Sequence, residues 1–89
     1  MTRVLKWRVP LDDQPHPIGA GRVVLVAQQQ YGVASEMQVW TVETYGGGTR
    51  YVQVFGTGHT VPDDWEPVGS CVSVDGQFVW HVFERMAAA

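Results

Sequence analysis

The clearest pattern in the chain is its C-terminal stretch, where two apolar, β-branched segments flank Asp75 and Gly76. An Asp-Gly pair between such segments is typical of a two-residue type I′ hairpin turn, in which both central residues have positive φ. This turn makes residues 68–74 and 77–84 antiparallel neighbours. The predicted cross-strand partners are Ser73 with Phe78, Val72 with Val79, Cys71 with Trp80 and Ser70 with His81.

The last strand and two other segments show strand patterns. The last strand, 77–84, is apolar at alternate and at intervening positions, which predicts a central strand covered on both sides. Residues 22–29 have the same pattern and predict a second interior strand. Residues 3–9 alternate strictly, with Leu5, Trp7 and Val9 on one side, and predict a strand with one buried face that Pro10 ends.

Residues 36–44 and 50–55 complete the predicted strands, and no segment has a helical period of 3.6 residues. Residues 11–21 and 56–67 are rich in proline and glycine and predict irregular surface loops, whereas 30–32 and 46–48 predict turns. Five to six short strands separated by turn residues predict an all-β fold: a small antiparallel barrel or sandwich with a C-terminal Asp-Gly hairpin.

The composition bounds the size and assembly of this fold. The 89 residues allow one domain, which we place at 1–85, with 86–89 as a disordered tail. Apolar residues make up 45% of the chain and charged residues 17%, below the ~25% usual for soluble domains. Small domains need extra support, and the single cysteine cannot form an intrachain disulfide. We therefore expect a homo-oligomer.

The charge pattern limits the partners. The net charge is −3 and the basic residues are scattered, which argues against general nucleic-acid binding. No apolar run approaches the ~18 residues of a membrane span, and no signal peptide is recognisable. A lone cysteine is typical of a reducing compartment. We expect a cytoplasmic protein with no membrane or nucleic-acid partner.

The most suggestive local cluster is Gly-Thr-Gly-His at 56–59. Glycines allow positive φ, so that successive N–H groups can turn inward and bind an anion. A basic side chain to neutralise phosphate and an aromatic ring to stack on a base would complete a nucleotide-like site. The predicted ligand-binding residues are Arg50, Gly56, Thr57, Gly58, His59 and Trp65. The alternatives are an ordinary tight turn at 56–59 and a tryptophan that plugs the end of the barrel.

No catalytic or metal site is predicted. The three histidines lack metal-ligand spacing. Cys71 and His81 have opposite parity in the hairpin, so they lie on opposite faces and cannot form a dyad. The adjacent acids at 12–13 and 63–64 sit in loops and do not face each other across a substrate. We expect no enzymatic activity, no cofactor and no metal.

Several motifs follow one another in a recognisable order. They are Val-Leu-Lys-Trp at 4–7, the segment 19–28, Val-Trp at 39–40, Gly-Thr-Gly-His at 56–59 and Val-Trp-His-Val-Phe-Glu at 79–84. In this order the chain resembles a family of small proteins of unknown function encoded by bacteriophages, mostly those of actinobacterial hosts. The resemblance implies a phage origin and action in the cytoplasm of a bacterial host, and it carries over no catalytic residue.

These observations predict a non-enzymatic binding module that sequesters a small anionic, nucleotide-like ligand, in the manner of proteins that absorb a defence signal. Two alternatives belong to another class of function. The chain could be a protein–protein interaction module that binds a host protein through an exposed aromatic residue or an edge strand. It could also be a structural component of the virion, such as a capsid decoration protein.

Overall fold

The structure is a computed structural model that describes residues 2–19, 21–28, 35–43 and 48–86. These residues form β-strands and no helix, which confirms the predicted all-β class. The strands are β1 (Arg3–Pro10), β2 (His16–Ile18), β3 (Arg22–Ala27), β4 (Glu36–Glu43), β5 (Arg50–Gly56), β6 (Glu66–Val72) and β7 (Val79–Met86). No helix within the described residues is long and apolar enough to cross a membrane.

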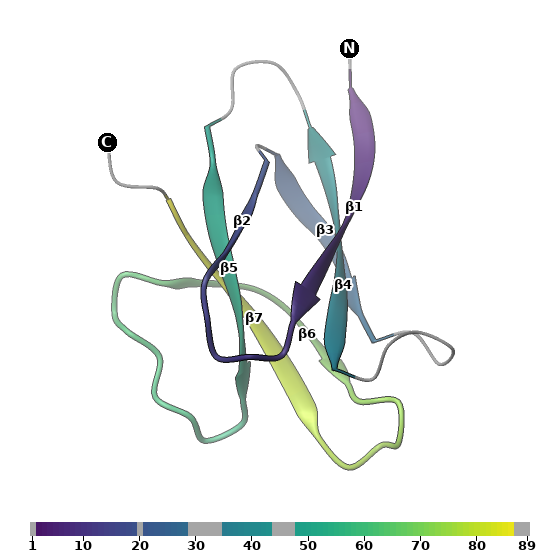
Figure 1. The fold of residues 1–89 in the computed structure, drawn as a ribbon, viewed down its shortest axis with the longest axis vertical. Helices are drawn as coiled ribbons and strands as arrows, with labels where there is room; N and C mark the ends of the chain where they lie inside the picture. Colours follow the sequence, from purple (N-terminus) through teal and green to yellow (C-terminus); the bar gives the residue numbers. More distant parts are fainter. Residues whose placement is uncertain (1, 20, 29–34, 44–47, 87–89) are drawn as a thin grey trace.

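The strands form two antiparallel sheets, in the orders β1-β4-β3 and β2-β5-β7-β6 (Figure 1). Residues that pair directly across antiparallel strands point to the same face, so each sheet contributes one set of alternating residues to the space between them. The buried core there consists of Val9, Ile18, Val26, Met37, Val39, Val52, Val54 and Val82. The arrangement is a two-layer sandwich, one of the two predicted architectures.

The C-terminal hairpin has the predicted register but a different turn. Ser70, Cys71 and Val72 pair with His81, Trp80 and Val79. The Ser73 N–H donates to Phe78 O at 2.8 Å, which confirms the fourth pair.

The predicted type I′ turn is wrong, because Gly76 has positive φ (76°) and Asp75 does not. Gly76 N–H donates to Ser73 O at 3.0 Å, and the Asp75 carboxylate accepts from Ser73 Oγ at 2.6 Å and Gln77 N at 3.0 Å. The aspartate side chain thus stabilises a longer loop, 74–77, within the same register.

Two strands differ from the prediction in how far they are covered. β7 lies between β5 and β6 as expected, but Val79 is 39% exposed, so its outer face is open at this end. β3 was predicted to be interior, yet it pairs only with β4 and contains a bulge at Val24. Val24 and Leu25 are 44% and 55% exposed. An apolar sequence pattern does not distinguish a central strand from an edge strand, because strand order is decided by the chain path.

The predicted loop 11–21 contains a short strand. β2 pairs with β5, and Ile18 enters the core with 3% of its surface exposed. Pro17 lacks an N–H group and is compatible with this edge position. The predicted turn at 30–32 lies outside the described residues, as does most of the turn at 46–48 and of the tail at 86–89, although β7 includes Met86.

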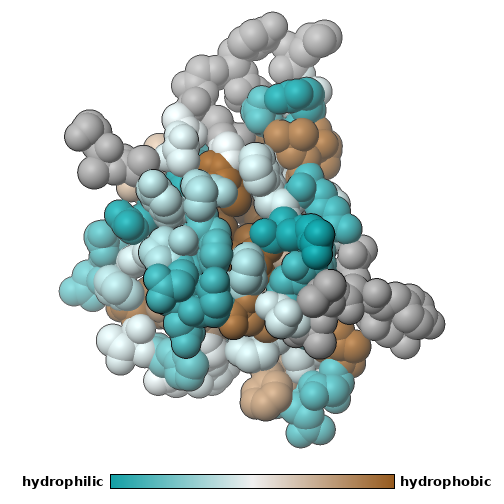
Figure 2. All heavy atoms as spheres, in the orientation of Figure 1, coloured by the Kyte–Doolittle hydropathy of each residue, from teal (hydrophilic) through white to brown (hydrophobic). Residues whose placement is uncertain are grey.

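The two sheets close on one side where the edge strands β3 and β6 meet. A Cβ atom on Gly69 of β6 would lie 2.8 Å from Cγ2 of Val26 on β3. Beyond this contact, the Val74 N–H donates to Oε1 of Gln28 at 3.0 Å. Figure 2 shows that apolar residues reach the viewed surface in several separate places between hydrophilic ones.

Candidate functional site

The Gly-Thr-Gly-His segment leaves the end of β5 in a tight turn. His59 N–H donates to Gly56 O at 3.1 Å, and Gly56 N–H donates to His59 Nδ1 at 3.3 Å. Within the segment positive φ occurs at Gly58 (88°) and not at Gly56. The N–H groups of Gly56 and His59 are therefore used inside the turn and do not form the predicted anion-binding array. Because Nδ1 accepts a hydrogen bond, the proton of the neutral His59 ring is on Nε2.

The hydroxyl of Thr57 attaches this turn to the neighbouring strand. Thr57 Oγ1 lies 2.8 Å from His81 Nε2 and donates to Val79 O at 3.4 Å, and His81 Nδ1 lies 2.8 Å from Ser70 Oγ. A neutral imidazole has one donor and one acceptor nitrogen, so it can satisfy both hydroxyls at once. His81 therefore joins the 56–59 turn to β6 and β7, and its predicted contact with Ser70 is confirmed.

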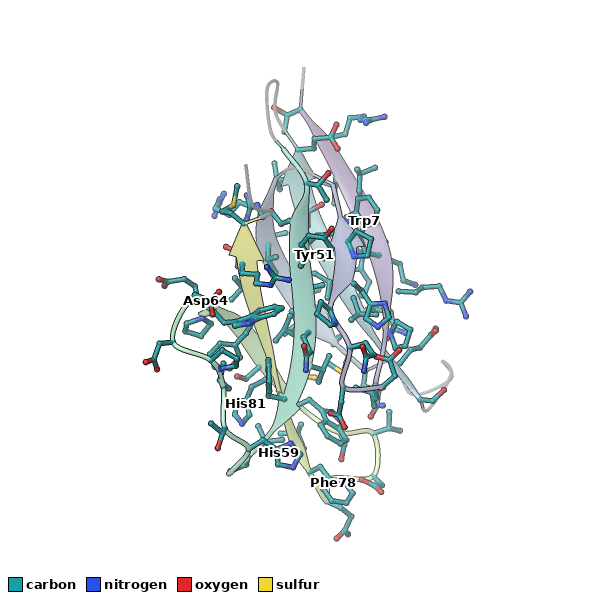
Figure 3. The ribbon with its side chains drawn as sticks, turned by 60° about the vertical axis from the view of Figure 1, so that its left-hand side comes forward. Trp7, Tyr51, His59, Asp64, Phe78 and His81 are labelled. Carbon is teal, nitrogen blue, oxygen red and sulfur yellow. The ribbon has the colours of Figure 1, made fainter. Side chains whose placement is uncertain are left out.

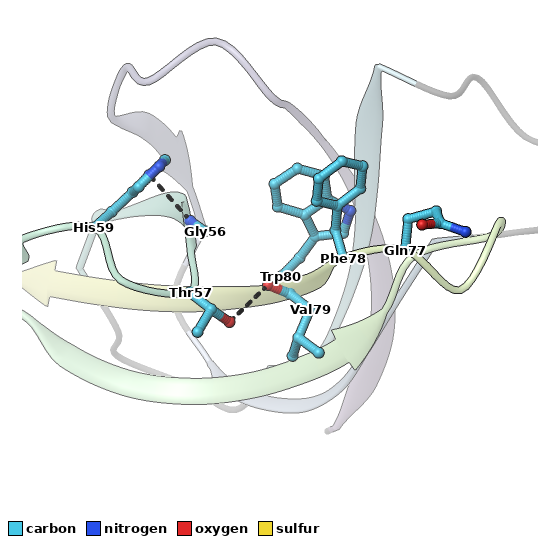
Figure 4. A pocket seen from close by; sticks show the side chains of 7 residues that line it. All are labelled: Gly56, Thr57, His59, Gln77, Phe78, Val79 and Trp80. Atoms are coloured by element: carbon cyan, nitrogen blue, oxygen red, sulfur yellow. Dashed lines mark hydrogen bonds between the residues drawn. The ribbon is translucent and has the colours of Figure 1, made fainter.

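A pocket of about 480 Å³ opens beside the turn (Figure 4). It is lined by Gly56, Thr57, His59, Gln77, Phe78, Val79 and Trp80. The rings of Phe78 and Trp80 are stacked, with centroids 5.5 Å apart and planes 24° apart, and Phe78 is 56% exposed. The His59 ring stands across the pocket from this pair. The volume and the mainly apolar lining are typical of small-molecule sites.

Trp80 lies where three hollows meet. It also lines a hollow of about 290 Å³ beside Val74 and one of about 200 Å³ beside Leu11. Its indole Nε1 is buried and has no hydrogen-bond partner within the described residues. A buried donor left in this way costs about 1–3 kcal/mol, and native proteins rarely retain one. Among the described residues, this end of the sandwich is thus the part in which a buried polar group lacks a hydrogen bond.

Arg50 does not join this pocket. It lies at the opposite end of β5 from Gly56, roughly 20 Å along the strand at ~3.4 Å per residue. Arg50 Nη1 makes an ion pair of 2.6 Å with Glu84 Oε2, and the two side chains are 19% and 20% exposed. The structure therefore assigns this guanidinium to a half-buried cross-strand pair rather than to the 56–59 turn.

Trp65 is also held away from the pocket. Its side chain is 9% exposed and packs edge-on against Phe55, with centroids 6.0 Å apart and planes at 75°. The guanidinium of Arg85 lies 5.2 Å from the Trp65 ring centroid and 5.1 Å from that of Tyr51. Trp65 therefore anchors the 57–65 loop to the outer face of the four-stranded sheet, and its ring faces are occupied by neighbours.

The aromatic wall of the pocket was not predicted as part of a site, although its residues were recognised in the hairpin. The available signal was the position of Phe78, a large aromatic residue directly after a turn, two positions from Trp80 on the same face of the strand. In strands such residues stand side by side. The sequence did not predict that the chain brings residues 56–59 next to this hairpin.

Asp12, His16 and Cys71 have local partners outside this pocket. His16 Nε2 lies 2.7 Å from Asp12 Oδ1, and this hydrogen bond lowers the pKa of Asp12. Burial raises the pKa of the Cys71 thiol, whose Sγ lies 4.0 Å from Met37 Sδ. No cluster of three or more His, Cys, Asp or Glu within the described part of the chain could hold a metal ion.

Comparison with known proteins gives one match. The model of a protein family described as a domain of unknown function, DUF7352, matches residues 1–89. Neither a curated protein nor a solved structure matches the chain. Because the family model covers the whole chain, this protein belongs to the DUF7352 family of domains of unknown function.

Proposed function

We propose that this protein is a non-enzymatic binding module that captures a small, nucleotide-like ligand in the pocket between the 56–59 turn and the C-terminal hairpin. The observation that carries the proposal is the stack of the exposed Phe78 ring on the half-buried Trp80 ring, on one wall of a 480 Å³ pocket. An exposed aromatic ring such as Phe78 is costly to leave in water, and it offers a flat apolar surface to a planar ring.

The lining supports recognition of a base. Stacking of a base on an aromatic side chain contributes about 1–3 kcal/mol, judged from alanine substitutions. The Gln77 amide can donate and accept at a base edge, and His59 Nε2–H is a donor on the opposite wall. Together these groups suit a heteroaromatic ring that carries both donors and acceptors.

The lining gives weaker support to phosphate groups. Arg50 is paired with Glu84, and Gly56 N–H is bonded to His59. Among the lining residues, His59 is the one that can become positively charged. We therefore propose that the base lies against Phe78 and Trp80, and that the anionic part of the ligand extends past His59 toward solvent.

The biological setting is part of the same proposal. The resemblance to phage-encoded proteins suggests action in the cytoplasm of a bacterial host, where lowering the free concentration of a nucleotide-like defence signal would benefit a phage. Sequestration requires affinity and abundance but no reacting groups. A protein with an aromatic binding wall, and without a group of His, Cys, Asp or Glu side chains in its described residues that could hold a metal ion, is compatible with that role.

The experiment has two parts. Native mass spectrometry of protein purified gently from a bacterial host should detect an adduct of a few hundred daltons per site, the size of a nucleoside or nucleotide. Titration with nucleosides and nucleotides, followed by tryptophan fluorescence, should then give saturable binding. Phe78→Ala should weaken it about 5- to 150-fold, the equivalent of ~1–3 kcal/mol, whereas Phe78→Trp should retain it.

Val4→Ala provides the control, because Val4 is 64% exposed on the other sheet and does not line the pocket. It should bind like the wild type. If Phe78→Ala and wild type bind all tested ligands equally, or if no ligand binds and no adduct is found, the proposed pocket is not a ligand site.

A second candidate function is a protein–protein interaction module that uses the same hairpin. Four large apolar side chains on it are exposed: Val72 (59%), Val74 (46%), Phe78 (56%) and Val79 (39%). Exposed apolar surface of this kind often marks a partner site. Retention of one host protein at fixed stoichiometry by wild type, its loss with Phe78→Ala, and the absence of a small-molecule adduct would favour this alternative.

A further inference from the structure

The outer face of the three-stranded sheet carries an ordered group of side chains. In the register of β1, β4 and β3, Lys6, Trp40 and Leu25 form one row across the sheet. The adjacent row consists of Val4, Val42 and Arg22. Because the alternate residues Val9, Met37 and Val39 are buried between the sheets, both rows point outward. Trp40 therefore lies in the middle of an outward-facing, partly apolar surface, which we call the Trp40 face.

The Trp40 face is apolar in its centre and basic at its edges. Leu25 and Val4 are 55% and 64% exposed, and Lys6 Nζ lies 5.4 Å from the centroid of the Trp40 ring. Arg22 is exposed, and no carboxylate of the described residues lies within ion-pair distance of it. Apolar surface flanked by basic groups has the composition of a protein interface whose partner is acidic.

The opposite side of the sandwich presents an acidic turn. Trp65 N–H donates to Pro62 O at 3.1 Å, which closes a turn with Asp63 and Asp64 at its tip. Both aspartates and Pro62 are exposed, and neither carboxylate has an ion-pair partner within the described residues. The turn is held in place because Trp65 is buried against Phe55. Figure 3 shows Asp64 on the left of the molecule and β1 on the right.

We propose that the acidic turn of one copy docks on the Trp40 face of a second copy. The Pro62 ring would lie against Trp40, and the Asp63 and Asp64 carboxylates would face Lys6 and Arg22. The turn is already closed by a hydrogen bond and anchored by the buried Trp65, so docking orders few additional groups. The two surfaces lie on opposite sides of one chain and cannot meet within it. The contact therefore joins unlike patches, so one copy of a pair keeps an unused Trp40 face and the other keeps an unused acidic turn for further copies.

The charge arrangement predicts how this association behaves. Exposed ion pairs are weak and are screened by salt, with a Debye length of about 10 Å at 0.1 M and 3 Å at 1 M. Sedimentation velocity of the full chain over a concentration series should show a mass that increases beyond a dimer at low salt. The association should decrease on addition of 1 M NaCl.

Charge reversal provides the decisive variants. Arg22→Glu and Asp64→Lys should each abolish association, because each sets like charges against each other in every contact between identical copies. An equimolar mixture of the two should associate again, because each variant then meets a partner of opposite charge. Glu66→Lys is the matched control: it makes the same change of charge two residues from Asp64, outside the turn tip, and should associate like the wild type.

Three results would overturn the proposal: a wild type that is monomeric over the whole series at low salt, association that survives Arg22→Glu, or variants whose mixture stays monomeric. The last outcome would mean that Arg22 and Asp64 do not face each other across a contact. These residues do not line the pocket of the proposed function, so either idea can fail without the other.

Discussion

Gly69→Ala tests the contact that closes the sandwich. Gly69 lies on β6, and the Cβ atom that alanine adds there would be 2.8 Å from Val26 Cγ2 and 3.2 Å from Val26 Cγ1. Carbon atoms pack best at about 3.5–4.0 Å, so one atom pair is short by roughly 0.7 Å. Val26 is 8% exposed and β-branched, which leaves it little freedom to rotate away.

The magnitude follows from two opposing effects. Overpacking in a closely packed core costs about 1–3 kcal/mol. Replacing glycine by alanine inside a strand stabilises the fold by about 0.5–1 kcal/mol. This gain applies to Gly69 because its φ is not positive. We expect a net loss of about 0.5–2 kcal/mol in the free energy of unfolding. For a domain of this size, a loss of 1 kcal/mol lowers Tm by about 4–8 °C.

A double-mutant cycle with Val26→Ala identifies the cause. Without the Val26 methyl groups, the nearest remaining atom of residue 26 is Cβ at 3.6 Å, an ordinary contact. Gly69→Ala should then be neutral or stabilising, which corresponds to a coupling energy of about 1–3 kcal/mol. Urea unfolding followed by tryptophan fluorescence measures all four proteins. If Gly69→Ala is equally destabilising with and without Val26→Ala, the contact with Val26 is not its cause.

Three further predictions concern polar groups. Arg50→Ala should lower the free energy of unfolding by about 1–3 kcal/mol in urea, because it leaves the half-buried Glu84 carboxylate without its partner at 2.6 Å. The pKa of Asp75 is lowered mainly by the hydrogen bond from the Ser73 hydroxyl. The stability that Asp75 contributes is therefore present above its unfolded pKa of ~3.9 and is lost as the pH falls through its lower folded value, so Asp75→Asn should reduce the change in stability over this acid range. Burial raises the pKa of Cys71, so its thiol should react with iodoacetamide at pH 8 more slowly in the folded protein than in urea.

Each of these predictions has an outcome that contradicts it. Equal stability of Arg50→Ala and wild type would mean that the pair with Glu84 adds nothing to the fold. An unchanged acid transition in Asp75→Asn would mean that this carboxylate has the same pKa in the folded and unfolded chains. Equal rates of Cys71 alkylation in buffer and in urea would show that the thiol is not shielded.

Periodicity alone predicted most of the strands. The alternation of Leu5, Trp7 and Val9 gave β1, and the paired apolar segments around Asp75 gave the register of the final hairpin. These predictions succeeded because a side chain on a strand points up or down according to its position, and because a short loop fixes the partners of the flanking residues. The turn type failed because the Asp75 side chain competes with the backbone for hydrogen bonds.

The residues of the candidate site could not be predicted from local sequence patterns, because the site combines residues that the fold brings together. Arg50 and Gly56 are close in sequence, but an extended strand separates them, and Arg50 instead pairs with Glu84. Phe78 and His59 are distant in sequence and line the same pocket. Local pattern reports whether a residue suits a strand, turn or core. Only the course of the chain in the tertiary structure shows which ends of which strands meet.

The sequence by itself therefore determined the all-β class, the central place of the last strand in its sheet and the pairing of the C-terminal hairpin. The tertiary structure decided that β3 is an edge strand, that Trp65 anchors a loop, and that the aromatic wall of the pocket is built by Phe78 and Trp80. The physical reason is the distance along the sequence over which each kind of interaction acts. Alternation and turn chemistry act over a few residues, whereas strand order and pockets arise from the packing of two sheets across loops whose course no local pattern specifies.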